Sequence, residues 1–510
     1  MKKVLFINPP GKVRILDNGK PAHRKHCTPS LSLAYLTTSL LENDYEVEIV
    51  DMIAEGYDNE KIVDGYVIYG LDNEELLERI EKFKPDIIGI SFMFTFTVSV
   101  VKDICNSIKK NFDIPIILGG YHASGAPVDC LKDKNVDYVM AGESDFTILE
   151  FMEFLDSKRE IDEVQNLYYR KDNEIIHTSR NKKSVKTGKQ WAQYRAKEYG
   201  IPTKLDELKR PAWHKFPMEC YWNTDVRVGG GDAVRKKYGV LLSSRGCPHT
   251  CFYCTSPLVS GYKGYRRRSN ENILAEIRWL VDEYDIEEFG FLDDNFFVDK
   301  KEVKKLLKLI AIEFPNIMFT VPGGTEVNKL DYEMVDLLAE ANFYKALVAV
   351  EAADQTIQDN MIDKQVDISH AMKMSKYMQE KGIEVRGQFM IGFPGETKEQ
   401  IKKTTDMARN SFFDDFYISI VTPMPGTQFY DDCIDNDLLI DDFDLENIQF
   451  SKSNIKLPDT TPEELEAIRR DVWHEEFEKK RQKMKVDKQE RHSRHENTEE
   501  YEEIGFKSLK

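Results

Sequence analysis

The chain has no apolar run of about 18 residues, which is the length that a helix needs to cross a membrane. Residues 1–10 contain only a short apolar stretch, which is not enough for a secretory signal peptide. Positive charge is not in excess either: 71 Lys and Arg against 89 Asp and Glu give a net charge of -18. Because nucleic-acid binding needs a basic surface, we expect neither a membrane span nor a general nucleic-acid partner.

Cysteine is also scarce, with eight residues in a chain of 510. Small secreted domains that rely on disulfides carry a far higher share of cysteine, so we expect free thiols and a reducing cytoplasm. Short repeats of the solenoid type are absent from the sequence. The length suggests about three domains, and a hydrophobic share of 41% is enough for packed cores.

The first part of the chain alternates apolar runs with helical patterns, and we assign it to one domain, residues 1–155. The pattern predicts a doubly wound α/β fold, with helices on both faces of a parallel sheet. Ligands bind beyond the carboxyl ends of the strands in such sheets. The predicted strands are 4–7, 45–51, 86–91, 114–120 and 137–143, and the predicted helices are 29–42, 71–83 and 98–111. The strand ends carry Asn8, Asp51, Ser91, Gly119, Gly120, Gly142 and Glu143.

A second alternating region, residues 239–450, predicts an open, partial barrel of six β/α units. Active-site groups of barrels collect at the carboxyl ends of the strands. The predicted strands are 238–242, 288–296, 317–321, 346–351, 385–397 and 416–421.

Two further segments complete the predicted organisation. The connector, residues 156–238, contains a predicted hairpin at 164–178, a basic run at 180–189 and three glycines at 229–231. Residues 451–510 predict a helix that begins with a capping box at Thr461 and Glu464 and ends in a charged tail.

Three cysteines directly follow the first barrel strand, with the spacing Cys-x3-Cys-x2-Cys: Cys247, Cys251 and Cys254. Three thiolates can hold three irons of a [4Fe-4S] cluster and leave the fourth iron open, whereas such clusters normally have four cysteine ligands. A structural zinc site and chance clustering are the alternatives, but a structural zinc site needs a fourth Cys or His. His249, inside the same loop, is badly placed for that role.

The cysteine loop with Tyr253 resembles the signature of radical S-adenosylmethionine (SAM) enzymes. Other stretches resemble the group of these enzymes that has an N-terminal cobalamin (B12)-binding domain, the class B methyltransferase-like group. They are 8–10, 29–36, 119–124, 142–147, 293–296, 387–397 and 423–427. Ser144 and Asp145 depart mildly from the usual pattern of that group, and Ala352 and Ala353 replace a usual Ser-Gly pair.

The resemblance implies three cofactors: a [4Fe-4S] cluster, SAM and cobalamin. The implied metal ligands are Cys247, Cys251 and Cys254. The implied SAM contacts are Tyr253, Glu351, Gln388 and Pro423. The implied cobalamin contacts are Asn8, Ser91, Gly119, Gly120, His122, Gly142 and Glu143. The Asp-x-His-x-x-Gly motif, which supplies histidine to cobalt in other cobalamin enzymes, is absent from the sequence.

Several alternatives stay open at this point. The first domain could have lost its cofactor, Glu351 could be a surface residue, and His122 could lie off the cofactor. The segment that contains Arg266 and Arg268 could be a solvated basic turn, or it could bind carboxylates of a cofactor.

The resemblance implies an enzyme that methylates an unactivated sp3 carbon, using a SAM-derived 5'-deoxyadenosyl radical and methylcobalamin. One alternative is a related enzyme that performs cyclisation, rearrangement or redox chemistry without methyl transfer. Another is a non-catalytic metal-binding interaction module. The enzyme would take a small-molecule or peptide substrate and an electron donor such as flavodoxin or ferredoxin. No side chain is singled out as a catalytic acid or base.

Overall fold

The computed structural model describes residues 2–15, 19, 21, 24–178, 201–224, 234–260, 264–323, 325–362 and 365–473. The predicted basic run at 180–189, the glycines at 229–231 and the predicted charged tail beyond residue 473 lie outside the described residues. None of the helices in the described part of the chain is long and apolar enough to span a membrane.

The N-terminal domain is built on a seven-stranded sheet in the order β10-β9-β8-β7-β6-β1-β3. The five strands from β3 to β8 in this order pair in parallel, as predicted. The strands are β1 (Lys3–Asn8), β3 (Glu46–Asp51), β6 (Ile87–Ser91), β7 (Ile116–Gly119), β8 (Tyr138–Met140), β9 (Leu167–Lys171) and β10 (Glu174–His177). The helices are α1 (Leu31–Leu41), α2 (Met52–Glu55), α3 (Asn73–Phe83), α4 (Val98–Asn111), α5 (Tyr121–Gly125), α6 (Pro127–Lys132) and α7 (Thr147–Leu155).

Helices cover both faces of this sheet because successive strand residues point to opposite sides. In β1, Val4 and Phe6 join the hydrophobic core that contains residues of α1 and α7. The alternating Leu5 and Ile7 join a separate core that contains residues of α3, α4 and α6. The doubly wound α/β prediction is therefore confirmed.

Two features of this domain differ from the sequence-based expectation. The hairpin β9–β10 was assigned to the connector, but it pairs with β8 and extends the N-terminal sheet. A small antiparallel sheet, in the order β2-β5-β4, was not predicted. Its strands are β2 (Gly11–Arg14), β4 (Glu60–Val63) and β5 (Tyr66–Tyr69).

The second domain is an open sheet of six strands in chain order, β11-β14-β15-β16-β17-β18, and all neighbouring pairs are parallel. The strands are β11 (Tyr238–Leu241), β14 (Glu288–Phe291), β15 (Met318–Val321), β16 (Phe343–Glu351), β17 (Glu384–Ile391) and β18 (Asp415–Ile420). The helices are α11 (Asn270–Tyr284), α12 (Lys300–Glu313), α13 (Tyr332–Glu340), α14 (Gln355–Met361), α15 (Ile368–Glu380), α16 (Lys398–Asn410) and α17 (Gln428–Asp435). The predicted partial barrel of six β/α units is confirmed.

The helix α18 (Pro462–Asp471) begins as predicted, with reciprocal bonds between the backbone N–H groups and side chains of Thr461 and Glu464. It packs on the barrel: Leu465 is fully buried, and Arg469 donates to the backbone carbonyl of Ile418 in β18.

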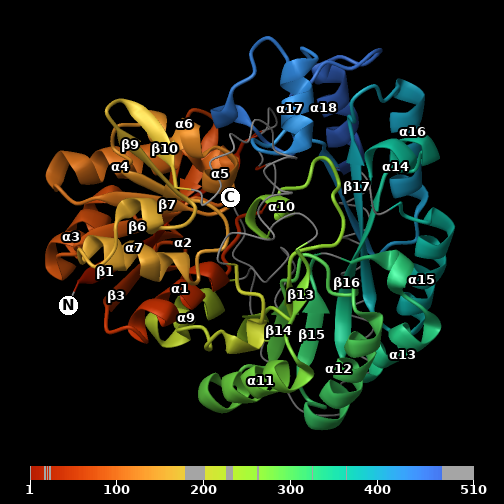
Figure 1. Cartoon of the computed structure of the whole chain (residues 1–510). Helices are drawn as coiled ribbons and strands as arrows, with labels where there is room; N and C mark the ends of the chain where they lie inside the picture. Colours follow the sequence, from red (N-terminus) through yellow and green to blue (C-terminus); the bar gives the residue numbers. More distant parts are fainter. Residues whose placement is uncertain are drawn as a thin grey trace.

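The two domains lie side by side, and the short helix α10 (Ser256–Ser260) is placed between them in Figure 1. It contacts α5 of the N-terminal domain. The connector helix α9 (Met218–Trp222) contacts α2. Gly426 after β18 also meets Gly125 closely, since a Cβ atom at Gly426 would lie 2.7 Å from the Cα of Gly125. The carboxyl ends of the N-terminal strands therefore face the cysteine loop.

Candidate functional site

A cavity of ≈ 660 Å³ lies between the two domains. All but one of the strand-end residues predicted to contact cobalamin line it, namely Asn8, Ser91, Gly119, Gly120, Gly142 and Glu143. The barrel contributes Leu242, Arg245, Gly246, Leu292 and Asp294 to the same lining. The sheet edge that sequence reasoning selected is therefore the wall of a space that both domains share.

Gly120 occupies a conformation that favours glycine, with φ 114° at the N-terminus of α5. A Cβ atom there would lie 2.7 Å from the backbone oxygen of Phe92, so any side chain would force the backbone to shift. Gly119 differs, because a Cβ atom there would make an ordinary contact of 3.7 Å with the backbone oxygen of Met140. Of these two glycines, Gly120 is the one that the backbone itself requires.

Asn8 is held by a buried network at the end of β1. Its side-chain amide donates to Asp51 at 2.9 Å, and the hydroxyl of Tyr221 donates to the same carboxyl group at 2.5 Å. Burial raises the pKa of Asp51 to about 6, against the lowering effect of these hydrogen bonds. Tyr221 is fully buried and ties the connector to these strand ends.

His122 is the one predicted cobalamin contact that is not part of the cavity lining among the described residues. Its side chain is buried, its Nδ1 is hydrogen-bonded to the hydroxyl of Thr95 at 3.0 Å, and its ring packs on Phe92. Burial lowers the pKa of His122 to about 4, so the ring is neutral. The ring of His122 therefore packs on Thr95 and Phe92 outside the cavity lining, and its contact with cobalamin stays a prediction.

The cysteine loop follows β11 and is fixed by two neighbouring carboxylates after β14. Asp293 accepts hydrogen bonds from the backbone N–H of Ser243 at 2.9 Å and from the Ser243 and Ser244 hydroxyls. Asp294 accepts from the backbone N–H of Gly246 at 2.9 Å. Sequence reasoning noticed this acidic pair as a motif, but only the structure shows that it holds the start of the cysteine loop.

The three cysteines do not form a single-ion site. Among the described residues, no three His, Cys, Asp or Glu side chains are grouped so that they could hold one metal ion, whereas structural zinc needs four such ligands. His249 instead pairs with Glu326 at 3.1 Å. The side-chain amide of Asn295 contacts the Cys247 sulfur at 3.8 Å. A cluster with a separate iron for each thiolate fits this loop better than zinc does.

Glu351 ends β16 and is buried, with 5% of its surface exposed, so the surface interpretation is wrong. It has φ 68°, in the left-handed region, and the β16–β17 register shifts next to it. A non-glycine residue held in this way costs roughly 1–3 kcal/mol and is typical of functional sites. Burial raises the pKa of Tyr253 well above its usual range, and a hydrogen bond to Glu351 raises it further.

The other two predicted SAM contacts lie on the adjoining strands. Gln388 is half-buried in β17 and pairs in register with Ala349 of β16. Pro423 is buried just after β18. The aromatic rings of Phe252 and Tyr253 both pack against Phe393, which follows β17. The end of the cysteine loop therefore lies against the strand ends that sequence reasoning assigned to SAM.

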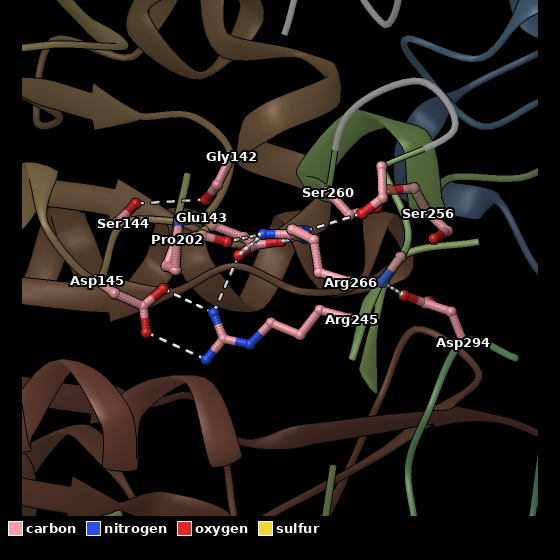
Figure 2. A network of polar contacts seen from close by, with 12 residues as sticks. Gly142, Glu143, Ser144, Asp145, Pro202, Arg245, Ser256, Ser260, Arg266 and Asp294 are labelled. Atoms are coloured by element: carbon pink, nitrogen blue, oxygen red, sulfur yellow. Dashed lines mark hydrogen bonds and ion pairs between the residues drawn. The ribbon is translucent and has the colours of Figure 1, made fainter. Parts of the chain in front are cut away.

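The arginine segment after the cysteine loop is not a solvated turn, because Arg266 and Arg268 are largely buried and form ion pairs. Arg266 forms ion pairs with Glu143 of the N-terminal domain and donates to the backbone carbonyl of Pro202 at 2.8 Å. Arg268 is buried and pairs with Glu276 of α11 at 2.5 Å. Figure 2 shows the Arg266 contact together with that of Arg245, which reaches Asp145 and Glu143. These arginines bind the protein's own carboxylates.

Tyr121 and Asp294 also line the cavity, although sequence reasoning gave neither a role. The charge of Asp294 is the main reason that the pKa of Tyr121 lies well above its usual range, and burial adds to it. Their positions after two different strands, in different domains, left no local signal that they would meet.

The burial of Glu396, after β17, leads us to expect a measurable effect of pH on stability. Its carboxyl group is fully buried, accepts hydrogen bonds from the backbone of Gly392 and Phe393, and has its pKa raised to about 7 by burial. The unfolded chain ionises near 4.5, so between pH 4.5 and 7 the folded state binds more protons and stability falls as pH rises. The raised pKa of Glu396 lowers the free energy of unfolding by about 1–3 kcal/mol over this pH range.

We therefore expect Glu396→Gln, which can accept the same bonds without a charge, to become more stable than the wild type as pH rises through that window. Thermal unfolding midpoints at pH 5 and pH 8 test the prediction. A difference between variant and wild type that is the same at both pH values would contradict it.

Two family models match the chain: "B12 binding domain" over residues 22–151 and "Radical SAM superfamily" over residues 241–408. Cytidylyl-2-hydroxyethylphosphonate methyltransferase of Streptomyces wedmorensis is 30% identical over 479 residues, covering 90% of this chain and 86% of that protein. An anaerobic magnesium-protoporphyrin IX monomethyl ester cyclase of Rubrivivax gelatinosus is 23% identical, covering 88% and 72%.

Among solved structures, the radical SAM methyltransferase TsrM of Kitasatospora setae, with cobalamin and a [4Fe-4S] cluster bound, has a similar fold. Its TM-score is 0.65 at 17% identity, over 86% of this chain and 78% of that chain. An open parallel barrel with a three-cysteine loop, joined to a doubly wound domain across one cavity, defines an enzyme that combines two cofactor-binding domains. The chain belongs to the radical SAM superfamily, in the group whose members carry a B12-binding domain.

Proposed function

We propose that this protein is a cobalamin-dependent radical SAM methyltransferase that transfers a methyl group to an unactivated sp3 carbon. The observation that carries the proposal is the shared cavity: glycine-lined strand ends of the B12-binding domain face barrel residues that flank the cysteine loop. The methyltransferase relative, at 30% identity over most of both chains, supports this outcome over others.

The residues present fit the three cofactors. Cys247, Cys251 and Cys254 would bind three irons of the cluster, and the Asn295 amide lies against one of the sulfurs. Glu351 and Tyr253 would hold SAM, because the buried carboxylate can accept hydrogen bonds from ribose hydroxyls. Gln388 and Pro423 would supply the remaining contacts to SAM.

Cobalamin would occupy the cavity against the lining residues Asn8, Ser91, Gly119, Gly120, Gly142 and Glu143. When bound, these cofactors supply reductive cleavage of SAM and transfer of a methyl group. The chain supplies the distance and orientation between them, because its two domains form opposite parts of one lining.

The proposed function also implies domain limits, a class of substrate, an electron donor and a cellular compartment. The first domain would extend through the hairpin to residue 178, and the barrel domain would begin at residue 239. The substrate would be a small molecule or a peptide, and a low-potential donor such as flavodoxin or ferredoxin would supply the electron. A reducing cytoplasm suits a chain with eight cysteines and no disulfide bond among the described residues.

Cyclisation without methyl transfer is the second candidate, and the cyclase relative is the observation that favours it. Anaerobic reconstitution with iron, sulfide and cobalamin tests what the two candidates share. We expect about four irons per chain and a cobalamin absorption spectrum that remains with the protein after gel filtration. A single zinc ion per chain and no retained cobalamin would contradict both candidate functions.

Glu351→Gln should weaken SAM binding while the cluster stays in place. Losing a charged acceptor costs roughly 1.5–3 kcal/mol, or about tenfold to hundredfold in affinity. Anaerobic equilibrium dialysis with labelled SAM measures this on the cluster-loaded protein. Glu313→Gln, which removes a carboxylate from α12, is the control and should leave the affinity unchanged. Equal affinity in the wild type and Glu351→Gln would remove Glu351 from the SAM site.

A further inference from the structure

We propose that Arg245 and Asp145 form an interdomain clamp that fixes the separation between the two cofactors. The proposal rests on the two-cofactor function above, and it gives these residues a positioning role. Arg245 lies two residues before Cys247, and Asp145 lies three residues after Gly142, which lines the cavity. The clamp therefore joins the first cluster ligand directly to the loop that would contact cobalamin.

The contact between Arg245 and Asp145 is bidentate. One guanidinium nitrogen lies 2.7 Å from Asp145 Oδ2, and the other lies 3.1 Å from Oδ1. The first nitrogen also lies 3.0 Å from Glu143 Oε2. Two parallel hydrogen bonds fix orientation as well as distance, so this pair resists rotation of one loop against the other. Figure 2 shows the Arg245 guanidinium turned toward both carboxylates.

The second arginine makes the arrangement specific. Arg245 in β12 (Ser244–Arg245) pairs in register with Arg266 in β13 (Arg266–Arg267). Like charges directly opposite one another on paired strands repel. Glu143 bonds to both guanidinium groups, and Asp145 supplies a second negative charge. The two-stranded sheet therefore needs the N-terminal domain in place to offset its own repulsion.

Burial makes the clamp rigid. The side chains of Glu143 and Asp145 are 6% and 5% exposed, and those of both arginines are 13% exposed. The guanidinium of Arg245 also lies 4.9 Å from the ring of Tyr35 in α1, which adds a cation–π contact from a third element. Charges buried in this way have no water to replace a lost partner, so the domains cannot slide without breaking the network.

The turn between Arg245 and the first cluster ligand, Cys247, is also fixed in position. Gly246, between Arg245 and Cys247, donates its backbone N–H to Asp294. It has φ 79°, and a Cβ atom there would lie 2.6 Å from the backbone oxygen of Gly264. A turn fixed on both sides transmits the position of the Arg245 backbone to the first cysteine. A change at Asp145 therefore changes where the cysteine loop sits relative to the cavity.

The test uses the full chain loaded with both cofactors. The reduced cluster and cob(II)alamin are both paramagnetic, so pulsed EPR measures the distribution of distances between them. We expect a narrow distribution in the wild type and a broader or shifted one in Arg245→Lys and Asp145→Asn. Lysine keeps the charge but loses the bidentate geometry, and asparagine keeps the shape of aspartate but loses its charge.

A second readout is the rate at which SAM methylates the reduced bound cobalamin. Misplacement by about 1 Å can cost about a hundredfold in rate, and we expect a decrease of about tenfold to hundredfold in both variants. Arg268→Lys is the matched control: Arg268 is also a buried arginine in an ion pair, but its partner Glu276 lies within the barrel. The control should keep both the wild-type distance distribution and the wild-type rate.

Unchanged distances and rates in Arg245→Lys and Asp145→Asn would overturn the proposal. Loss of one cofactor from both variants would also overturn it, because a positioning residue leaves each cofactor bound. A wild-type protein that fails to load both cofactors would instead contradict the proposed function, so the two failures are distinguishable.

Discussion

Replacing Cys251 by alanine should remove the cluster and abolish cleavage of SAM. The loop offers only three cysteine ligands, so the same loop contains no further cysteine that could replace a missing thiolate. Iron content should fall from about four per chain to near zero. Formation of 5'-deoxyadenosine with a strong reductant should fall below detection.

Cys220→Ala is the matched control for this variant. Cys220 is a partly exposed free cysteine of α9, outside the cysteine loop. Iron content and SAM cleavage should remain at wild-type levels in this control. A Cys251→Ala protein that keeps its iron would show that the cluster is held elsewhere.

Arg245→Met should cause a large loss of stability. It would leave the buried carboxylates of Asp145 and Glu143 facing an apolar side chain. Removing one partner of a buried ion pair costs roughly 3–5 kcal/mol, because the remaining charge has lost its compensation. The thermal unfolding midpoint should fall, and hydrogen exchange should accelerate in the loop that contains Glu143 and Asp145.

An exposed ion pair in the same protein provides the comparison. Arg278 of α11 pairs with Glu313 of α12, with side chains 53% and 33% exposed. Arg278→Met should change stability by less than about 1 kcal/mol, because water screens surface pairs. Equal effects of Arg245→Met and Arg278→Met would show that the interdomain network contributes no more than a surface contact.

Local pattern was sufficient to predict the parallel strands of the two large sheets. A continuous apolar run, Val4-Leu5-Phe6-Ile7, fits a strand that is buried on both faces. The structure places these side chains alternately in two different cores. The residues at the ends of these strands could be predicted to lie together, because parallel strands bring their carboxyl ends to one edge of the sheet. Asn8, Ser91 and Gly120 could therefore be named before their common cavity was seen.

Contacts between distant segments were not predictable from spacing. Arg245 and Asp145 are separated by 100 positions, and Tyr221 and Asp51 by 170. Nothing in the local sequence distinguishes a clamp arginine from a solvated one, so the basic segment around Arg266 was assigned to solvent or to a cofactor. The surroundings of His122 were not predictable either: it follows two glycines in the sequence, but its ring turns to Thr95 and Phe92.

The hairpin β9–β10 illustrates a third limit. Its two strands were recognisable from composition, but a hairpin does not specify which sheet it joins. The pairing of Tyr138 with Tyr169 and of Val139 with Tyr168 assigns it to the N-terminal sheet. Domain limits drawn from sequence composition alone therefore placed it in the connector.

Transfer of a labelled methyl group from SAM to bound cobalamin tests the two-cofactor account most directly, and it needs no knowledge of the substrate. The cluster- and cobalamin-loaded protein would be reduced anaerobically and incubated with SAM carrying a deuterated methyl group. The account predicts labelled methylcobalamin on the protein together with 5'-deoxyadenosine in solution. Formation of 5'-deoxyadenosine with no label on retained cobalamin would contradict it.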